Sequence, residues 1–210
     1  MLFSTPYWLR RLYGKDLIWE MPDDGRTIYL SFDDGPNPDT TPVILHTLKQ
    51  YDANATFFCV GENVVKNPEL YEMIHNNGHA VGNHTYNHLN GWKTSKARYL
   101  ENVQKNREVV NNLIFRPPYG RITRSQKKSL SRHYDIFMWT VLSRDFDARV
   151  SRETCLEKTW EHTRPGAIVV FHDHPKAIEK VEYVLAQYIE RAIGRGYRFK
   201  ALSSKRDGLF

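Results

Sequence analysis

The sequence predicts an α/β fold in which parallel strands alternate with helices. Short apolar runs alternate with longer amphipathic segments from residue 27 to residue 200, which is the pattern of βαβ units. Polar motifs directly follow five of the apolar runs. Functional groups at the carboxyl ends of several parallel strands are typical of β/α barrels. The strand count is about seven, short of the eight strands of a complete barrel.

The expected elements follow one another in a regular order. The strands are residues 27–32, 55–60, 79–83, 113–116, 136–142, 167–171 and 197–200. The helices, one after each of the first six strands, are residues 41–51, 67–77, 95–112, 125–134, 151–163 and 176–194. Boundary residues support these limits: Pro68 and Gly78 flank the second helix, and Ser151 suits the N-cap of the fifth.

The composition indicates a globular chain with one principal domain. It has 210 residues, of which 40% are hydrophobic and 26% are charged. We expect residues 27–210 to form the domain and residues 1–26 an N-terminal extension whose aromatic side chains pack over it; an exposed sugar platform is the alternative. The net charge of +6 is spread along the chain, so we expect no nucleic-acid partner. Cys59 lies in an apolar run and is expected to be a buried thiol.

Segments that would direct the chain to a membrane are not evident. No apolar stretch approaches the roughly 18 residues that a membrane span requires. Residues 1–19 lack the continuous apolar core and the small-residue cleavage site of a signal peptide. A cytoplasmic location is therefore the default expectation, and the cell envelope remains open because a leader can be removed. The sequence does not indicate an oligomeric state.

The first polar motif is the aspartate pair Asp33 and Asp34, which stands between a strand and a Gly-Pro turn. A turn alone would account for two acidic residues at this place. In the catalytic interpretation, one carboxylate binds a metal ion and its neighbour acts as a general base, so that the pair activates a water molecule.

The second motif places His84 and His88 four residues apart. On one helical turn these two imidazoles would face the same way and could bind one metal ion. With nine histidines in the chain, such a pair can also arise by chance. A carboxylate would complete an Asp-His-His set, which suits catalytic zinc, although iron oxygenases use a similar set. The double aspartate and a later histidine favour hydrolysis.

The remaining motifs supply candidate supporting groups. Residues 116–120 form an Arg-Pro-Pro-Tyr-Gly loop that proline stiffens, and Arg116 could hold a carboxylate in place. A backbone N–H of this loop could face a developing oxyanion. His172 ends the most apolar run, where a lone histidine would more often be a core residue. Asp145 at the end of another strand could raise the pKa of His172, which suits a general acid that protonates an amine.

These five motifs, in this order, resemble those of the polysaccharide deacetylase family with the NodB homology domain, carbohydrate esterase family 4. The resemblance runs from about residue 27 to residue 202 and covers most of the chain. Residues 31–36 match the family's Thr-Phe-Asp-Asp-Gly-Pro with one conservative change, at Ser31. The resemblance implies a distorted (β/α)7 barrel, NodB-type fold. It also implies a hydrolase that removes N-acetyl groups from amino sugars of peptidoglycan- or chitin-type polysaccharides.

The resemblance implies a role for each matching residue. Asp34, His84 and His88 would hold one divalent metal ion, with zinc expected and cobalt, nickel or manganese as alternatives. Asp33 would be the catalytic base, oriented by Arg116.

The acid side of the site is implied in the same way. His172 would be the catalytic acid, tuned by Asp145, and the Tyr119 backbone N–H would assist the oxyanion. Pro117 and Pro118 would shape the wall of the substrate groove.

The chain departs from the family in the fourth motif. Members often carry Asp-x-x-Asp-Trp there, and this chain has Leu142 and Phe146 in place of the first aspartate and the tryptophan. Because both replacements would line the groove, they put the substrate preference in doubt. An O-acetyl esterase that acts on xylan-like glycans and a non-catalytic glycan-binding relative therefore remain alternatives.

Overall fold

Parallel strands and surrounding helices occupy most of the computed structural model, which describes residues 2–22 and 25–206. The strands are β1 (Leu17–Ile18), β2 (Thr27–Asp33), β3 (Ala55–Cys59), β4 (Ala80–Asn83), β5 (Ile114–Phe115), β6 (Asp135–Phe137), β7 (Val141–Leu142), β8 (Ile168–His172) and β9 (Arg198–Phe199). The α-helices are α1 (Tyr7–Tyr13), α2 (Thr41–Gln50), α3 (Gly61–Lys66), α4 (Pro68–Asn76), α5 (Lys96–Arg107), α6 (Arg124–Leu130), α7 (Arg152–Glu161) and α8 (Ile178–Gly194). Short 3₁₀ helices are η1 (Gly91–Lys93), η2 (Pro118–Gly120) and η3 (Pro175–Ala177).

The strands form one sheet in the order β1-β6-β5-β4-β3-β2-β8-β7, and β9 pairs with β2. Each of these strand pairs is parallel. β2 is buried over its whole length because it has neighbours on both sides and side chains on both faces, as its continuous apolar run predicts. The predicted α/β fold, a distorted barrel of parallel strands and helices, is therefore confirmed.

One short segment passes from one part of the sheet to another. We predicted a single strand over residues 136–142, but the structure divides it into β6 and β7. β6 pairs with β5, whereas β7 pairs with β8 near the other end of the strand order. The three residues between them change the pairing partner, so one regular ladder cannot continue through them. Thr140 lies between the two strands and contacts β8 through its hydroxyl. Its Oγ1 accepts from Ile168 N at 2.9 Å and donates to the Ile168 carbonyl at 3.0 Å.

The N-terminal extension contributes to the same sheet. β1 pairs with β6, and Glu20 forms an isolated antiparallel bridge to Ala167 just before β8. Trp19 is buried in a cluster with side chains from α5 and α6. Tyr7 and Trp8 on α1 are instead 70% and 64% exposed. The two expected domains, residues 1–26 and 27–210, include residues 1, 23–24 and 207–210, which lie outside the described residues.

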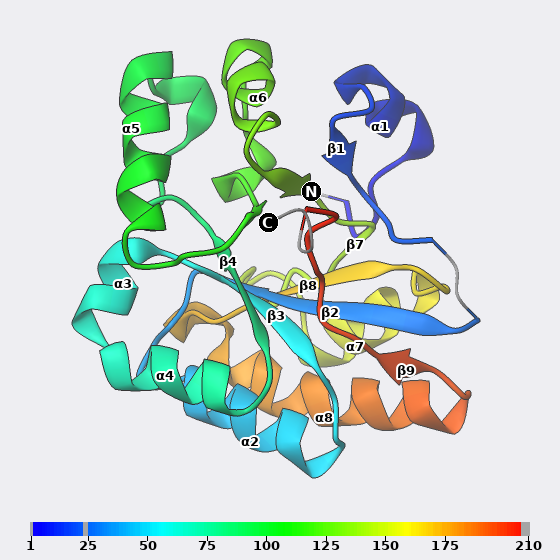
Figure 1. Ribbon diagram of the computed structural model, residues 1–210. Helices are drawn as coiled ribbons and strands as arrows, with labels where there is room; N and C mark the ends of the chain where they lie inside the picture. Colours follow the sequence, from blue (N-terminus) through cyan, green and yellow to red (C-terminus); the bar gives the residue numbers. More distant parts are fainter. Residues whose placement is uncertain (1, 23–24, 207–210) are drawn as a thin grey trace.

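The helices cover the outside of the curled sheet (Figure 1). α2, α4 and α8 lie below the central strands in this view, whereas α5 and α6 lie above them. One side chain from each of five strands contributes to a single buried cluster, together with Leu202: Tyr29, Phe58, Ile114, Phe137 and Ile168. The carboxyl ends of the strands therefore surround a packed core on which a site can be held rigidly.

Four helices differ from the prediction. α1 and α3 were not expected, α5 ends at Arg107 rather than at residue 112, and α6 ends at Leu130 rather than at residue 134. Within the residues that the structure describes, no helix is both long and apolar enough to span a membrane.

Candidate active site and metal centre

Asp34, His84 and His88 lie together at the carboxyl end of the sheet. Asp34 follows β2, and the two histidines follow β4. One ligand atom from each residue lies within 4.8 Å of the others. Asp34 Oδ1 is 2.9 Å from His88 Nε2 and 3.5 Å from His84 Nε2. These three side chains therefore form a compact group with two nitrogen donors and one oxygen donor.

The hydrogen bond on the far side of His84 shows why a cation fits this group. His84 Nδ1 lies 2.8 Å from the carbonyl oxygen of Arg116, which can only accept, so Nδ1 carries the proton. In the neutral ring, Nε2 then presents a lone pair towards the Asp34 carboxylate. Two acceptors that face each other are stable when a cation lies between them. Burial alone would raise the pKa of Asp34, but the contacts with His84 and His88 hold it well below its ordinary value.

The two histidines do not lie on a helix, and our structural explanation for their spacing was wrong. Residues 84–88 form a loop in which Thr85 and His88 have positive φ angles of 61° and 53°. The Asn83 side chain accepts a bond from Thr85 N at 2.9 Å, and Asn102 accepts bonds from the next two N–H groups. These side-chain acceptors replace helical carbonyls, so the loop brings the imidazoles together in a different conformation.

Asp33 lies beside the metal group with its carboxylate held from behind. Arg116 Nη1 donates to Asp33 Oδ1 at 2.7 Å and to Ser31 Oγ at 2.8 Å. Arg116 is fully buried, and its guanidinium also donates to the carbonyl oxygens of Phe137 and Met138. Burial lowers the pKa of Arg116, while Asp33 opposes that effect. Arg116 therefore fixes one oxygen of Asp33 and leaves Oδ2 free of this contact.

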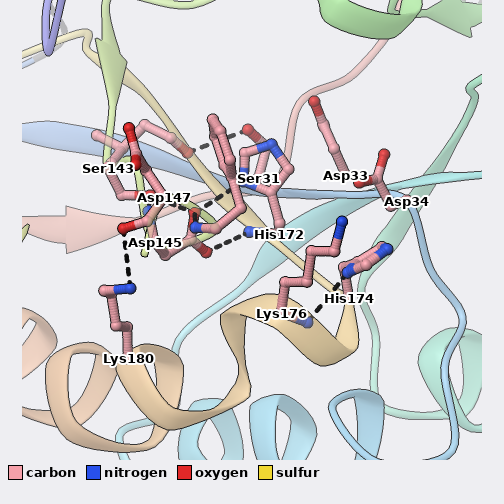
Figure 2. A network of polar contacts seen from close by, with 12 residues as sticks. Ser31, Asp33, Asp34, Ser143, Asp145, Asp147, His172, His174, Lys176 and Lys180 are labelled. Carbon is pink, nitrogen blue, oxygen red and sulfur yellow. Dashed lines mark hydrogen bonds and ion pairs between the residues drawn. The ribbon is translucent and has the colours of Figure 1, made fainter. Parts of the chain in front are cut away.

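His172 stands opposite Asp33, since the two residues are paired in the β2–β8 register. Asp145 is fully buried and accepts from His172 Nδ1 at 2.8 Å and from His172 N at 2.7 Å. Figure 2 shows Asp145 on one side of His172 and the Asp33–Asp34 pair on the other. Burial would lower the pKa of His172, but the negative charge of Asp145, aided by Asp34 and Asp33, raises it to about 9.

Tyr119 lies in a strained turn beside the metal group. Its φ of 60° and ψ of 8° are left-handed, which is uncommon for a residue with a side chain. The two hydrogen bonds that close this turn use the N–H groups of Gly120 and Arg121, so they leave the N–H of Tyr119 unused. Its ring lies edge-on to His88, with centroids 4.6 Å apart. Backbone strain of this kind is concentrated at functional sites.

A pocket of about 460 Å³ joins these groups. Its wall contains the metal group, Asp33, His172 and Tyr119, together with Leu142 and Phe146, the two departures in the fourth motif. The Phe146 ring lies edge-on to His172 at 4.6 Å between centroids. Pro117 and Pro118 do not line the pocket, contrary to our expectation, because both are buried beneath the turn that projects Tyr119.

Several pocket residues were not recognised in the sequence. Glu62 and Asn63 line the pocket from the start of α3, and Asn63 Nδ2 donates to the Asp34 carbonyl at 2.7 Å. Both follow β3 directly, so the rule that polar groups gather at strand ends could have identified them. Trp139 and Lys176 also line the pocket, and no sequence signal marked them.

Asp173 is a buried carboxylate directly behind the site. It accepts hydrogen bonds of 2.5 Å from the hydroxyls of Thr40 and Thr41, and its N–H donates to the Asp33 carbonyl at 2.7 Å. Burial raises the pKa of Asp173 to about 7. Asp173 thereby ties the start of α2 and the Asp33 loop to the end of β8.

Comparison with known proteins identifies relatives of this chain. The family model described as polysaccharide deacetylase matches residues 20–134. A peptidoglycan-N-acetylglucosamine deacetylase of Bacillus cereus is 35% identical over 191 residues, which cover 87% of this chain and 69% of the relative. The crystal structure of the Bc1960 peptidoglycan N-acetylglucosamine deacetylase, in complex with 4-naphthalen-1-yl-N-oxidanyl-benzamide, has a TM-score of 0.87 and 31% identity. This match covers 96% of our chain and 99% of the other.

A further similar structure is described as a pseudoenzyme. It is wild-type BA3943 from Bacillus anthracis, a family 4 carbohydrate esterase pseudoenzyme. The TM-score is 0.78 and the identity 25%, and the match covers 89% of our chain and 67% of the other. Fold similarity alone therefore does not establish catalysis, and the argument for activity depends on the residues of the pocket.

Proposed function

The chain belongs to the polysaccharide deacetylase family, and from this premise we propose that it hydrolyses N-acetyl groups on the amino sugars of a glycan. The observation that supports this proposal best is the content of one pocket. The carboxylate of Asp33, the imidazole of His172 and the Asp34–His84–His88 group all line it. Base, acid and metal ligands are the three components that metal-assisted amide hydrolysis requires.

In this proposal Asp33 is the general base. Arg116 binds its Oδ1, so Oδ2 accepts the proton of the attacking water. The Arg116 guanidinium also keeps the carboxylate in one orientation, because Ser31 and two backbone carbonyls fix the guanidinium in turn. The base is therefore positioned before substrate binds.

His172 is the general acid. Asp145 holds the proton on Nδ1 and raises the pKa, so the ring is protonated at neutral pH. Nε2 then donates its proton to the nitrogen of the departing amine as the C–N bond breaks. The N–H of Tyr119 stabilises the oxyanion that develops at the carbonyl, a contribution of about 3–4 kcal/mol per donor in comparable sites.

Asp34, His84 and His88 hold one divalent ion, and zinc is the ion we propose. The nitrogen and oxygen donors suit zinc with open positions, and cobalt, nickel or manganese could replace it. When bound, the ion polarises the acetamide carbonyl and lowers the pKa of a water molecule. The bond from His84 Nδ1 to the Arg116 carbonyl keeps Nε2 free for the metal.

The proposed substrate is a glycan of N-acetylhexosamine units, of the peptidoglycan type. The relative from Bacillus cereus and the similar crystal structure are both named for peptidoglycan N-acetylglucosamine. The net charge of +6 favours an anionic wall polymer over neutral chitin. Leu142 and Phe146 make the wall beside His172 apolar, which suits the methyl group of an acetamide.

Acetate release from peptidoglycan and from N-acetylglucosamine oligomers tests the function. We expect release that a chelator stops and that added zinc restores. Acetylated xylan in parallel reports ester hydrolysis, and a clear preference for xylan would replace the amide assignment. No release from any of these glycans by the zinc-loaded protein would favour a binding role.

Two substitutions test the assigned roles. Asp33→Asn is expected to retain the metal and lose turnover, since the amide cannot accept the proton. His84→Ala is expected to lose metal and activity together, as measured by elemental analysis. Asp39→Asn and His46→Ala, at exposed positions outside the pocket, are the matched controls. Substantial turnover in Asp33→Asn, or full metal occupancy in His84→Ala, would contradict the assignment.

A further inference from the structure

Trp92 is a large aromatic side chain at the surface with no role in the reaction described above. It is 57% exposed and lies in η1, on the loop that follows the metal-binding histidines. Single exposed aromatic residues are common on protein surfaces and need no special explanation. The surroundings of Trp92, however, distinguish it from an incidental exposed side chain.

The loop that carries Trp92 is firmly attached to the Tyr119 loop. Trp92 Nε1 donates to the Ile122 carbonyl at 3.3 Å, and Gly91 N donates to the Arg121 carbonyl at 3.2 Å. Gln126 Nε2 then donates to the Gly91 carbonyl at 2.9 Å. The two loops also touch at Gly91, where a Cβ atom would collide with the Arg121 carbonyl oxygen. The indole is therefore presented in one orientation, with little entropy left to lose on binding.

Arg121 connects Trp92 to the pocket. Its guanidinium carbon lies 5.2 Å from the ring centroid of Trp92 and 6.0 Å from that of Tyr119. Tyr119 is 54% exposed and lines the pocket. The three side chains thus form a continuous strip, the Trp92–Arg121–Tyr119 strip, which leads outward from the metal centre along the surface.

No described side chain neutralises the charge of Arg121. Within residues 2–22 and 25–206, no carboxylate forms an ion pair with Arg121. Cation–π contact with two rings orients the guanidinium but leaves its positive charge uncompensated. A planar, oriented guanidinium is well suited to a carboxylate.

We propose that the Trp92–Arg121–Tyr119 strip is a subsite for a sugar unit next to the one being deacetylated, and that this unit carries a carboxylate. The face of an aromatic ring is weakly negative and packs on the apolar C–H face of a pyranose. Trp92 supplies this stacking surface, and Arg121 binds the acidic substituent. The inference rests on the proposed function, because it assigns the specificity of that same pocket for acidic over neutral glycans.

Matched substrates can separate the two contributions. The acidic substrate is a set of peptidoglycan strands, and its control is the same set after reduction of the carboxylates to alcohols. Short and long N-acetylglucosamine oligomers provide a neutral series that differs only in length. Trp92→Ala should lower kcat/KM by about tenfold on long substrates, through KM, and far less on two-unit oligomers. Trp92→Phe should recover most of this loss.

Arg121→Gln should act on charge alone. We expect kcat/KM to fall by about fivefold on acidic strands and much less on reduced strands. The wild-type KM for acidic strands should rise with salt, and Arg121→Gln should reduce that dependence, which a purely structural role of Arg121 would not do. Arg121→Lys should retain the salt dependence. Equal losses on acidic and reduced strands would overturn the charge assignment.

Trp8→Ala and Arg11→Gln are matched controls, because they remove the same exposed residue types from α1, outside the pocket. If Trp92→Ala and Arg121→Gln behave like these controls while the wild type is active, the subsite inference fails and the proposed function stands. If the wild type deacetylates no glycan, the proposed function fails. Calorimetric binding of acidic strands to the wild type and to Trp92→Ala then still decides the inference, since equal affinities would reject it.

Discussion

Two largely buried histidines, one at the carboxyl edge of the sheet and one at the amino edge, have pKa values shifted in opposite directions. His172 ends β8 at the carboxyl edge, and Asp145 raises its pKa to about 9. His79 directly precedes β4 at the amino edge, packs on the ring of Phe57 and has no hydrogen-bond partner for either ring nitrogen among the described residues. Burial lowers the pKa of His79 to about 4.

The difference shows that one nearby carboxylate decides whether burial suppresses or permits the charge of an imidazole. Burial acts in the same direction on both rings, and it is the only cause of the shift at His79. At His172 the effect is reversed because Asp145 is fully buried, so water does not screen its charge. The carboxyl edge of the sheet is thus organised for chemistry and the amino edge for packing.

The largest expected effect is the loss of the proton donor. His172→Ala should lower the acetate-release rate by about 10²- to 10⁴-fold, because the amine leaves without general-acid assistance. His79→Leu should retain the wild-type rate, since its ring lies outside the pocket. Comparable losses in the two variants would mean that the contrast between the two histidines is not functional.

Removal of the carboxylate should make His172 resemble His79. In Asp145→Asn, burial is opposed only by the smaller effects of Asp34 and Asp33, so the pKa of His172 should fall from about 9 towards its ordinary value of 6.5. Because the acid must be protonated, the rate declines as pH rises through this pKa. The alkaline limb of the pH–rate profile should therefore shift to lower pH, and the rate at pH 8 should fall by about 30-fold. An unchanged alkaline limb would remove Asp145 from this role.

His79 should make the protein sensitive to acid. The unfolded chain binds a proton to His79 below pH 6.5, whereas the folded chain does so only near pH 4. The free energy of unfolding should thus fall as pH decreases from 6.5 to 4, by up to about 3 kcal/mol. Urea midpoints at pH 7 and pH 4.5 measure this loss, which should be smaller in His79→Leu and unchanged in the exposed control His46→Leu. Equal acid sensitivity in all three proteins would assign it to other groups.

The smallest expected effect concerns the ring beside His172. Phe146→Ala removes an edge-on contact of 4.6 Å between ring centroids, and should lower kcat about fivefold by loosening the imidazole. Phe146→Trp restores the residue type expected from the family motif and should retain activity. An unaltered kcat in Phe146→Ala would show that Asp145 alone positions His172.

Much of the architecture could be predicted because it depends on local patterns. The apolar runs located the central strands β2, β3, β4 and β8 within one or two residues. The prediction of one strand over residues 136–142 was wrong because the pairing partner changes midway from β5 to β8. Such a change depends on the curl of the whole sheet. β1 was missed because two residues are too few to show a periodic pattern.

The sequence predicted most residues of the candidate site, but not the conformation of the loops that carry them. The spacing of His84 and His88 indicated a shared site, yet the loop that joins them is held by Asn83 and by the distant Asn102. Pro117 and Pro118 were expected in the groove from the family resemblance, but both are buried and do not line the pocket.

The sequence by itself determined which residue types follow each strand, and through them the family and the candidate chemistry. Tertiary structure alone decided the proton on His84 Nδ1, the second hydrogen bond from His172 N to Asp145 and the continuity of the Trp92–Arg121–Tyr119 strip. The physical reason is the range of the interactions. Turn preferences and strand patterns act over a few residues, whereas electrostatic and ring contacts join groups that only the curled sheet brings together.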